Sequence, residues 1–281
     1  MVPNASCFVL LRRIGVSKVI INNPQGLTHD ELNERKLRAM GPDDQRIADE
    51  ALLFAKANRR EIAKRLTDTS IYVPEECPVS IFMAGSPGAG KTEASLEFLA
   101  RFEARSVRID PDLLRAEIPA YSGGNSYLFQ RAVSVLVDKL HDQVLKQNQS
   151  LLLDGTSANF ETVARNIRRS LRRGRFVLIL YVYQDPELAW RFVTAREQVE
   201  GRNIPLSEFV RQYFSARNVV NRLKIEFGHA VTVDILIKNE SGSTRLYKEN
   251  IQRIDDHVPE IYDQSSLERT LDDMRDINEP V

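Results

Sequence analysis

The hydrophobic residues of the chain fall into short continuous runs, separated by longer segments with helical spacing. Short runs of this kind are typical of strands that are buried on both faces. They predict five strands, VSIFMA at 79–84, SVRI at 106–109, SLLL at 150–153, FVLILYVY at 176–183 and VTVDILI at 231–237. Because strands and helices alternate, we expect an α/β fold with a parallel sheet of about five strands flanked by helices.

The segments around these runs carry apolar residues three and four positions apart, which predicts amphipathic helices. We expect helices over 47–66, ahead of the sheet, from Lys91 to about Phe102, and over 126–147. The turn sequence NESG at 239–242, followed by TRLY, predicts a hairpin at the C-terminal edge of the sheet.

This pattern divides the chain into three parts. Residues 1–46 form an N-terminal extension that we expect to be mostly helical, with a short strand at 17–23, and that is a candidate regulatory arm. Residues 47–254 form the α/β domain. Residues 255–281 are an acidic tail with nine carboxylates and two arginines, which is typical of a solvated, partly frayed helix.

Composition narrows the class of protein. The 281 residues are 42% hydrophobic and carry a formal net charge of zero, so there is no global attraction to nucleic acid or to an anionic membrane. Cys7 and Cys77 have no partner at metal-ligand spacing, and we expect buried or inert thiols in a reducing compartment. The longest apolar run, Phe176–Tyr183, is far shorter than the ~20 residues of a membrane helix. We therefore expect a cytoplasmic protein.

The strongest chemical signal is the segment GSPGAGKT, which fits the phosphate-loop pattern G-x-x-x-x-G-K-[ST] between a strand and a helix. Its glycines let backbone N–H groups turn toward phosphates, and the helix N-terminus adds unpaired donors. The predicted nucleotide-binding residues are Gly85, Ser86, Pro87, Gly88, Ala89, Gly90, Lys91 and Thr92. Lys91 is suited to the β and γ phosphates and the Thr92 hydroxyl to Mg²⁺.

Three carboxylates follow predicted strands at the edge where parallel sheets bind ligands. Asp110 and Asp112 follow the second strand, and Asp154 follows the third. A carboxylate there can accept a proton from an attacking hydroxyl, or order water around Mg²⁺. The structural alternative is that Asp112 caps the following helix and that Asp154 belongs to a turn with Gly155.

Arginines after the fourth strand are candidates for charge stabilisation during phosphoryl transfer. Arg196 lies on a predicted helix and Arg202 follows it; the alternative for each is an ordinary surface residue. A second set, the arginine stripe, lies on one face of another helix and consists of Arg165, Arg168, Arg169 and Arg172. Without interleaved aromatic residues it is more typical of a solvated face than of a nucleic-acid site. Trp190 is more typical of a packing anchor than of a base-stacking platform.

With these segments in view, residues 48–250 resemble the zeta toxin family. Beside the phosphate loop, the resemblance rests on IDPDLLRAEIPAY at 109–121, its most specific part, on LLLDGTSAN at 151–159, REQVEGRNIP at 196–205 and ILIKNESGSTRLY at 235–247. Members of the family are P-loop kinases that use ATP or GTP to phosphorylate a sugar hydroxyl of UDP-N-acetylglucosamine, which blocks cell-wall synthesis.

The resemblance implies roles for particular residues. Lys91 would hold the phosphates, Thr92 would hold Mg²⁺, and Asp112 would be the general base. Arg196 and Arg202 would stabilise the transition state. The residues implied to bind the substrate are Asp110, Asp154 and Thr156. Asp154 stands where the family usually has Glu, so its carboxylate is set back by one methylene.

The resemblance also implies a partner, an epsilon-type antitoxin that covers the nucleotide site; the alternative is that residues 1–46 act in cis on the same chain. Two other functions stay open on the residues alone. One is a kinase of another small hydroxyl compound or of a nucleic-acid 5′ end, for which the arginine stripe is the only hint. The other is a regulatory NTPase that binds a protein partner and has no acceptor.

Overall fold

The computed structural model describes the backbone of residues 40–100, 105–155, 157, 159–200, 204–239, 241, 244–259 and 262–276, and their side chains except at 197–200 and 275–276. The chain divides into two compact units, Met1–Met40 and Gly41–Val281, and the fold described below is that of the second. The strand expected at 17–23, and Cys7, lie outside the described residues.

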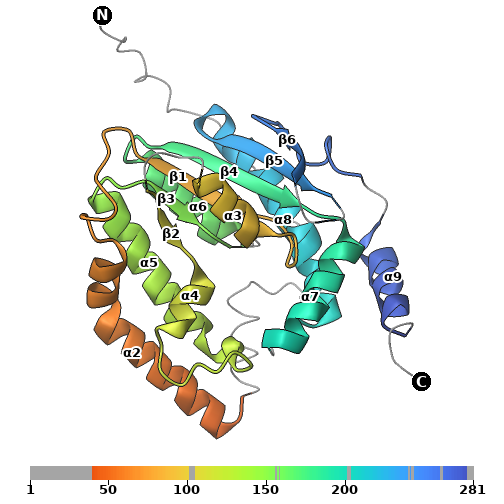
Figure 1. The fold of residues 1–281 in the computed structure, drawn as a ribbon, viewed down its shortest axis with the longest axis horizontal. Coiled ribbons are helices and arrows are strands. Elements are labelled where there is room, and N and C mark those ends of the chain that lie inside the picture. Colours follow the sequence, from red (N-terminus) through yellow and green to blue (C-terminus); the bar gives the residue numbers. More distant parts are fainter. Residues whose placement is uncertain are drawn as a thin grey trace, which may run out of the picture. The chain divides into compact units, whose positions relative to one another are not determined.

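A six-stranded sheet forms the centre of the unit, with the strand order β2-β3-β1-β4-β5-β6 (Figure 1). Its strands are β1 (Val79–Ala84), β2 (Val107–Ile109), β3 (Leu151–Leu153), β4 (Phe176–Tyr183), β5 (Thr232–Lys238) and β6 (Thr244–Lys248). All neighbouring strands are parallel except β5 and β6, which are antiparallel. The expected parallel sheet, flanking helices and closing hairpin are therefore confirmed.

Helices cover the sheet and connect its strands. They are α2 (Pro42–Leu66), α3 (Lys91–Leu99), α4 (Pro111–Ala116), α5 (Gln130–Lys146), α6 (Phe160–Leu171), α7 (Pro186–Glu200), α8 (Leu206–Phe227) and α9 (Gln264–Asp276), with 3-10 turns at Ser126–Phe129 (η1) and Gly228–Ala230 (η2).

Three expected helices have different bounds in the structure. The helix expected over 126–147 begins with the 3-10 turn η1, and its α-helical part, α5, starts at Gln130. Helix α2 begins at Pro42 and so crosses the predicted division at residue 46, because Pro at the first turn and the acidic residues Asp43 and Asp44 favour a helix start there. Helix α3 ends at Leu99 instead of near Phe102.

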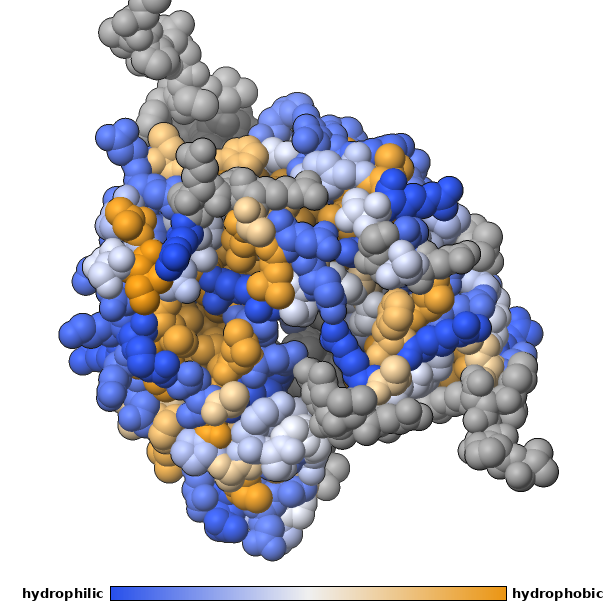
Figure 2. All heavy atoms as spheres, in the orientation of Figure 1, coloured by the Kyte–Doolittle hydropathy of each residue, from blue (hydrophilic) through white to orange (hydrophobic). Residues whose placement is uncertain are grey.

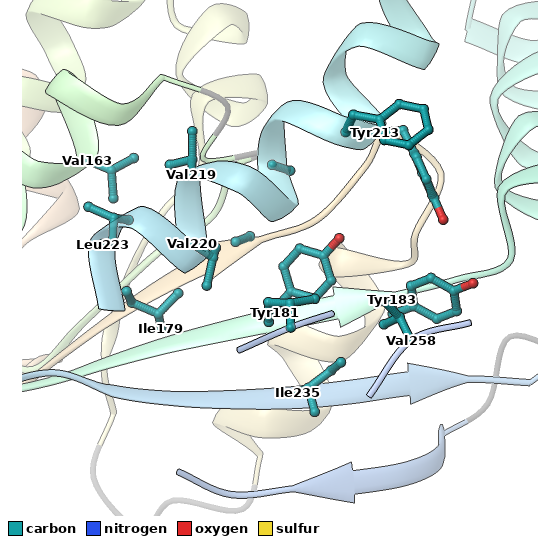
Figure 3. Close-up of a cluster of buried hydrophobic side chains, with 14 of the residues drawn as sticks. Val163, Ile179, Tyr181, Tyr183, Tyr213, Val219, Val220, Leu223, Ile235 and Val258 are labelled. Carbon is teal, nitrogen blue, oxygen red and sulfur yellow. The ribbon is translucent and has the colours of Figure 1, made fainter. Parts of the chain in front are cut away.

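The two faces of the sheet have separate hydrophobic clusters, and β4 contributes to both. Ile179 and Tyr181 belong to the cluster on the α8 side, whereas Leu178 and Leu180 pack with Met83 on the other. Figure 3 shows the α8 side, where side chains of α8 face those of β4. This alternation explains why β4 is apolar along its length: a central parallel strand is covered on both faces.

Helix α2 lies along α5, away from the central strands, as the orange and green helices of Figure 1 show. Its buried residues are mostly alanines, Ala48, Ala51 and Ala55 among them, which allows the two helices to approach closely. The helix before the phosphate loop is thus part of the folded unit.

The acidic tail departs from the solvated helix that its composition predicts. Helix α9 forms, but Leu267 and Leu271 are completely buried in the cluster on the α8 side. Just ahead of α9, the Tyr262 hydroxyl donates a hydrogen bond to Glu187 Oε1 at 2.7 Å, at the start of α7. Leucines four positions apart on one helical face outweigh the acidic composition.

Three smaller expectations concern single residues and membrane spans. Trp190 is buried with its ring 5.0 Å from that of Phe209, which confirms a packing role. Cys77 is exposed, so of the two alternatives, a buried or an inert thiol, burial does not hold at this position. Among the described residues, no helix has both the length and the hydropathy to span a bilayer.

Candidate active site

The phosphate loop joins β1 to α3 and is pressed against β4 and α7. Gly85, Gly88 and Gly90 have positive φ angles of 142°, 72° and 79°. A Cβ atom at Gly85 would lie 2.4 Å from the Val182 carbonyl oxygen, and one at Gly88 would lie 2.1 Å from that of Ala189. Glycine is required at both positions, because a side chain would collide with fixed backbone. The loop therefore has the backbone form that a phosphate cradle needs.

Lys91 and Thr92 begin α3, directly after the loop. The helix has no side-chain cap at Gly90, so its first N–H groups have no local side-chain acceptor. The Lys91 ammonium donates to two carbonyl oxygens of its own loop, Ser86 at 2.6 Å and Gly85 at 3.1 Å. Burial lowers the pKa of Lys91 to about 8, and the nearby carboxylate of Asp154 opposes that change.

The strand β2 ends in the two carboxylates that the sequence singled out, and they have different environments. Asp110 caps α4: its Oδ1 accepts a hydrogen bond from the Asp112 N–H at 2.8 Å, and its Oδ2 lies 2.8 Å from Arg108 Nη2. Burial raises the pKa of Asp110, against the lowering effects of that N–H and of Arg108. The capping role considered for Asp112 thus belongs to Asp110.

Asp112 lies in the first turn of α4 with about half of its side chain exposed (48%). Its carboxylate pairs with Arg115, which is nearly buried and also donates to Gln130 Oε1 at 2.9 Å. Arg115 is therefore anchored on α5 and can fix the position of the Asp112 carboxylate.

Asp154 follows β3 and is buried, with 5% of its surface exposed. Its Oδ2 accepts from Arg108 Nη2 at 2.5 Å and from Ser95 Oγ at 3.3 Å. Arg108 thus bridges Asp110 and Asp154, and Ser95 joins them to α3. This network ties the ends of β2 and β3 to the helix of the phosphate loop.

A cavity of about 450 Å³ lies beside the loop, between α3 and α7. Its lining includes Gly88, Gly90, Glu93, Arg196 and Lys238. Figure 2 shows that this face of the molecule is hollowed near its centre. Across the cavity, Arg196 Nη2 on α7 lies 3.1 Å from Glu93 Oε1 on α3.

Charges from separate segments act on the single ammonium of Lys91. Burial has the largest effect on the pKa of Lys91 and lowers it. In decreasing order, Asp154 then raises this pKa, Arg196 lowers it, and Asp112 and Glu93 raise it. Among the predicted residues, contacts of the side chains join Asp154 and Arg196 to helix α3, which Lys91 begins. Arg202 and Thr156 lie outside the described residues.

Sequence reasoning missed three charged residues of this region, Arg108, Glu93 and Lys238. Arg108 and Glu93 are recognisable only by their partners, which come from other segments of the chain. Lys238 ends β5 at the same edge of the sheet as Asp110 and Asp154. The strand-edge argument that found those carboxylates applies equally to this lysine.

The arginine stripe on α6 faces acidic partners. Arg165 Nη2 lies 3.0 Å from Asp138 Oδ1, and Arg169 pairs with both Asp138 and Asp142. Arg168 pairs with Glu226. Carboxylates from α5 and α8 thus offset much of the charge, which weakens the argument for a nucleic-acid surface.

Comparison with solved structures finds the same fold. The chain superposes on a structure from the PezAT chromosomal toxin–antitoxin system of Streptococcus pneumoniae, with a TM-score of 0.55, 18% identity, and coverage of 86% of this chain and 98% of the other. The AvrRxo1-ORF1:-ORF2 structure with ATP matches with a TM-score of 0.46, 16% identity, and coverage of 82% and 73%. No curated protein matches the sequence.

The Zeta toxin family model matches residues 62–252, which is more than half of the chain. The match includes the phosphate loop, the carboxylates at the ends of β2 and β3, and Arg196. It ends just after the β5–β6 hairpin that closes the sheet. This chain belongs to the Zeta toxin family.

Proposed function

We propose that this protein is a Mg²⁺-dependent kinase that transfers the γ-phosphoryl group of ATP or GTP to a sugar hydroxyl of UDP-N-acetylglucosamine, in the manner of a zeta-type toxin. The observation that carries the proposal is the phosphate loop itself: its glycines have positive φ angles and pack against fixed backbone, Lys91 begins α3 directly after it, and Arg196 lines the cavity beside it. The sugar-nucleotide acceptor is part of the proposal and is suggested by the resemblance to zeta toxins.

The residues of the loop fit a nucleotide triphosphate. Glycines at the required positive-φ positions, uncapped N–H groups at α3 and the Lys91 ammonium together provide donors and positive charge. The Thr92 hydroxyl, in the first turn of α3, is the ligand we assign to Mg²⁺. When bound, Mg²⁺ would neutralise charge on the β and γ phosphates.

On the acceptor side, Asp112 is the proton acceptor. As the sugar oxygen forms its bond to the γ-phosphorus, the bond from that phosphorus to the β–γ bridging oxygen breaks and ADP or GDP leaves. The hydroxyl proton passes to the Asp112 carboxylate. Arg196 and Arg202 would stabilise the charge on the transferring group, and Asp110, Asp154 and Thr156 are the remaining candidates for contact with the sugar nucleotide.

The ion pair of Arg196 with Glu93 bears on this scheme, because the arginine must exchange a carboxylate for phosphate oxygens. The two side chains are each about half exposed, so the ion pair contributes little stability. Breaking it to contact phosphate oxygens would therefore cost little free energy. Arg196 is therefore available to a triphosphate that enters the cavity.

A protein partner is also part of the proposal. The PezAT structure belongs to a toxin–antitoxin system. By extension, an epsilon-type antitoxin, or residues 1–46 acting in cis, would block the nucleotide site of this chain. A deletion of residues 1–40 tests the cis alternative, since it removes the first unit and leaves the complete helix α2. An unchanged kinase rate and unchanged growth inhibition would exclude it.

The kinase proposal is tested by incubating the protein with γ-labelled ATP or GTP, Mg²⁺ and a set of acceptors. We expect label on UDP-N-acetylglucosamine. Label on an oligonucleotide 5′ end or on another hydroxyl compound would support the kinase alternative, and free phosphate alone would support a regulatory NTPase. Lys91→Met serves as the control, because it removes the loop lysine from every one of these reactions.

A further inference from the structure

Lys238 is a buried cation that the catalytic scheme does not use. It is the last residue of β5, with 4% of its surface exposed. Among the residues that the structure describes, its Nζ has no hydrogen-bond partner. Lysines are rarely buried without a partner, because the ammonium loses its hydration and no hydrogen bond or ion pair offsets that loss.

The side chain of Lys238 points to the phosphate loop. Its Cε lies 3.5 Å from the position that a Cβ atom at Gly90 would occupy, and the residue lines the 450 Å³ cavity together with Gly88 and Arg196. The strand end that carries it is fixed, because Gln184 Nε2 donates to the Asn239 carbonyl oxygen at 3.1 Å. The ammonium is therefore held near the loop by the backbone of β5.

The carboxylate of Glu93, beside the same part of the loop, is paired with another residue. Glu93 Oε2 lies 3.6 Å from the same Cβ position at Gly90, but Glu93 forms its ion pair with Arg196. An anion that enters the cavity would therefore supply the ion pair and hydrogen bonds that the ammonium lacks. An ammonium is also a donor only, so it suits oxygens that carry negative charge.

We propose that Lys238 is a second lysine ligand of the nucleotide phosphates, which contacts them from the β5 side of the loop. This inference rests on the proposed function, since it requires that the loop binds a nucleotide. Lys91 is supplied by α3 and Lys238 by β5, so two separate elements would hold the same anion.

Contact with the nucleotide base is the competing interpretation, and the two differ in their effect on ATP and GTP. A phosphate contact is the same in both nucleotides. A donor aimed at the base would instead favour the carbonyl oxygen of guanine over the amino group of adenine.

The experiment compares Lys238→Met, Lys238→Arg and the control Lys56→Met, which removes a lysine exposed on α2. Affinities for fluorescent ATP and GTP analogues are measured by titration, and thermal unfolding is followed with and without ATP. We expect Lys238→Met to weaken both nucleotides about ten- to a hundredfold. Lys238→Arg should restore most of the affinity, and Lys56→Met should bind as the wild type does.

Thermal unfolding separates binding from a structural role. Without nucleotide, Lys238→Met should unfold at the same or a higher temperature than the wild type, because it removes an unpaired buried charge. With ATP, the unfolding temperatures of the wild type and of Lys56→Met should rise equally, and that of Lys238→Met should rise less.

Unchanged affinity in Lys238→Met, or a loss confined to one of the two nucleotides, would overturn the proposal. So would an ATP-dependent rise in unfolding temperature that is as large in Lys238→Met as in the wild type. A wild-type protein that binds neither nucleotide would instead contradict the proposed function. That outcome is distinguishable, because it is seen in the wild type itself, before any variant is compared.

Discussion

Three cationic side chains lie beside the phosphate loop, and a bound triphosphate would give each of them a new partner. Lys91 donates to carbonyl oxygens of its own loop, Arg196 pairs with Glu93, and the Lys238 ammonium has no partner among the described residues. Positive charge is thus concentrated where the loop glycines shape the backbone for phosphates. Each of these residues is expected to contribute separately to the affinity of the proposed site for a nucleotide.

The protonation of Lys91 makes nucleotide affinity depend on pH. Because the pKa of Lys91 is lowered to about 8, its ammonium in the free protein is largely neutral at pH 9 and charged at pH 7. A bound phosphate favours the charged form, so binding at pH 9 must take up a proton. We expect ATP to bind about tenfold more weakly at pH 9 than at pH 7, measured by isothermal titration calorimetry.

Lys91→Met is the control for this dependence on pH. The variant binds ATP weakly at both values, and its affinity should change far less between them. Calorimetry in buffers of different ionisation enthalpy reports the proton uptake directly. Equal wild-type affinity at pH 7 and pH 9, without proton uptake, would contradict the account of Lys91.

Residue types and their places in the sequence were enough to find much of the candidate site. The glycine pattern located the loop, and the ends of predicted strands pointed to Asp110, Asp112 and Asp154. The partners of these residues were not predictable, because Arg108 with Asp154 and Glu93 with Arg196 are pairs of residues far apart in sequence. The capping role considered for Asp112 belongs to Asp110 in the structure, and residue type does not distinguish them, because aspartate is a good cap at either position.

At the scale of elements, the parallel sheet explains why the site is where it is. The C-terminal ends of β1, β2, β3 and β5 lie at one edge and carry, in turn, the loop, Asp110, Asp154 and Lys238. Helix α5 supports this edge from the side. It contributes His141, which is completely buried with its ring 6.2 Å from that of Phe82 on β1.

His141 should make the fold sensitive to acid. Burial, with a smaller effect of Arg169, lowers the pKa of His141 to about 3, whereas an unfolded chain titrates its histidines near 6.5. The stability contributed by neutral His141 is therefore complete above about pH 6.5 and is lost as the pH falls toward 3. Between pH 7 and pH 5, the wild type should lose about 2 kcal/mol more unfolding free energy than His141→Leu, as measured by urea denaturation.

For each protein, the quantity compared is the change in unfolding free energy between pH 7 and pH 5. The packing change that the substitution itself causes is the same at both pH values and cancels. His229→Leu, on the 3-10 turn after α8, is a matched control, because His229 is exposed. If His141→Leu lost as much stability as the wild type over this range, the assignment of His141 as a neutral core residue would be wrong.

The strands were predictable as elements, but their order was not. Continuous apolar runs identify buried strands, and alternation with helices favours parallel pairing. The order β2-β3-β1-β4-β5-β6 depends on which side of β1 each connection crosses, and local sequence carries little information on that choice. The packing of α2 against α5 was missed for the same reason, because two strands, two α-helices and a 3-10 turn separate these helices in the sequence.

At the scale of the whole described unit, the fold extends beyond the part that the family model matches. That match ends at residue 252, yet Leu267 and Leu271 of α9 are completely buried in the larger hydrophobic cluster. The Tyr262 hydroxyl also binds Glu187, in the first turn of α7, the helix that carries Arg196. Helix α9 is thus an integral layer over α8, and its carboxylates Glu268, Asp272 and Asp273 are exposed.

Removing one of these leucines should measure how much α9 contributes. Leu271→Ala is expected to lower the free energy of unfolding by about 2–5 kcal/mol, because it leaves a cavity between α9 and α8. Leu53→Ala, at a side chain of α2 that is 67% exposed, should change it by less than about 0.5 kcal/mol. Urea denaturation that found the two variants equally stable would contradict the packed tail.

The central claim is that the phosphate loop and Asp112 act on the same acceptor hydroxyl. Single-turnover transfer from γ-labelled ATP to UDP-N-acetylglucosamine tests it, with Asp112→Asn compared with Asp256→Asn, which removes an exposed carboxylate elsewhere. We expect Asp112→Asn to bind ATP normally and to transfer label at least about 100-fold more slowly, while Asp256→Asn behaves as the wild type. Undiminished transfer by Asp112→Asn, or no transfer to the sugar by the wild type, would contradict the account.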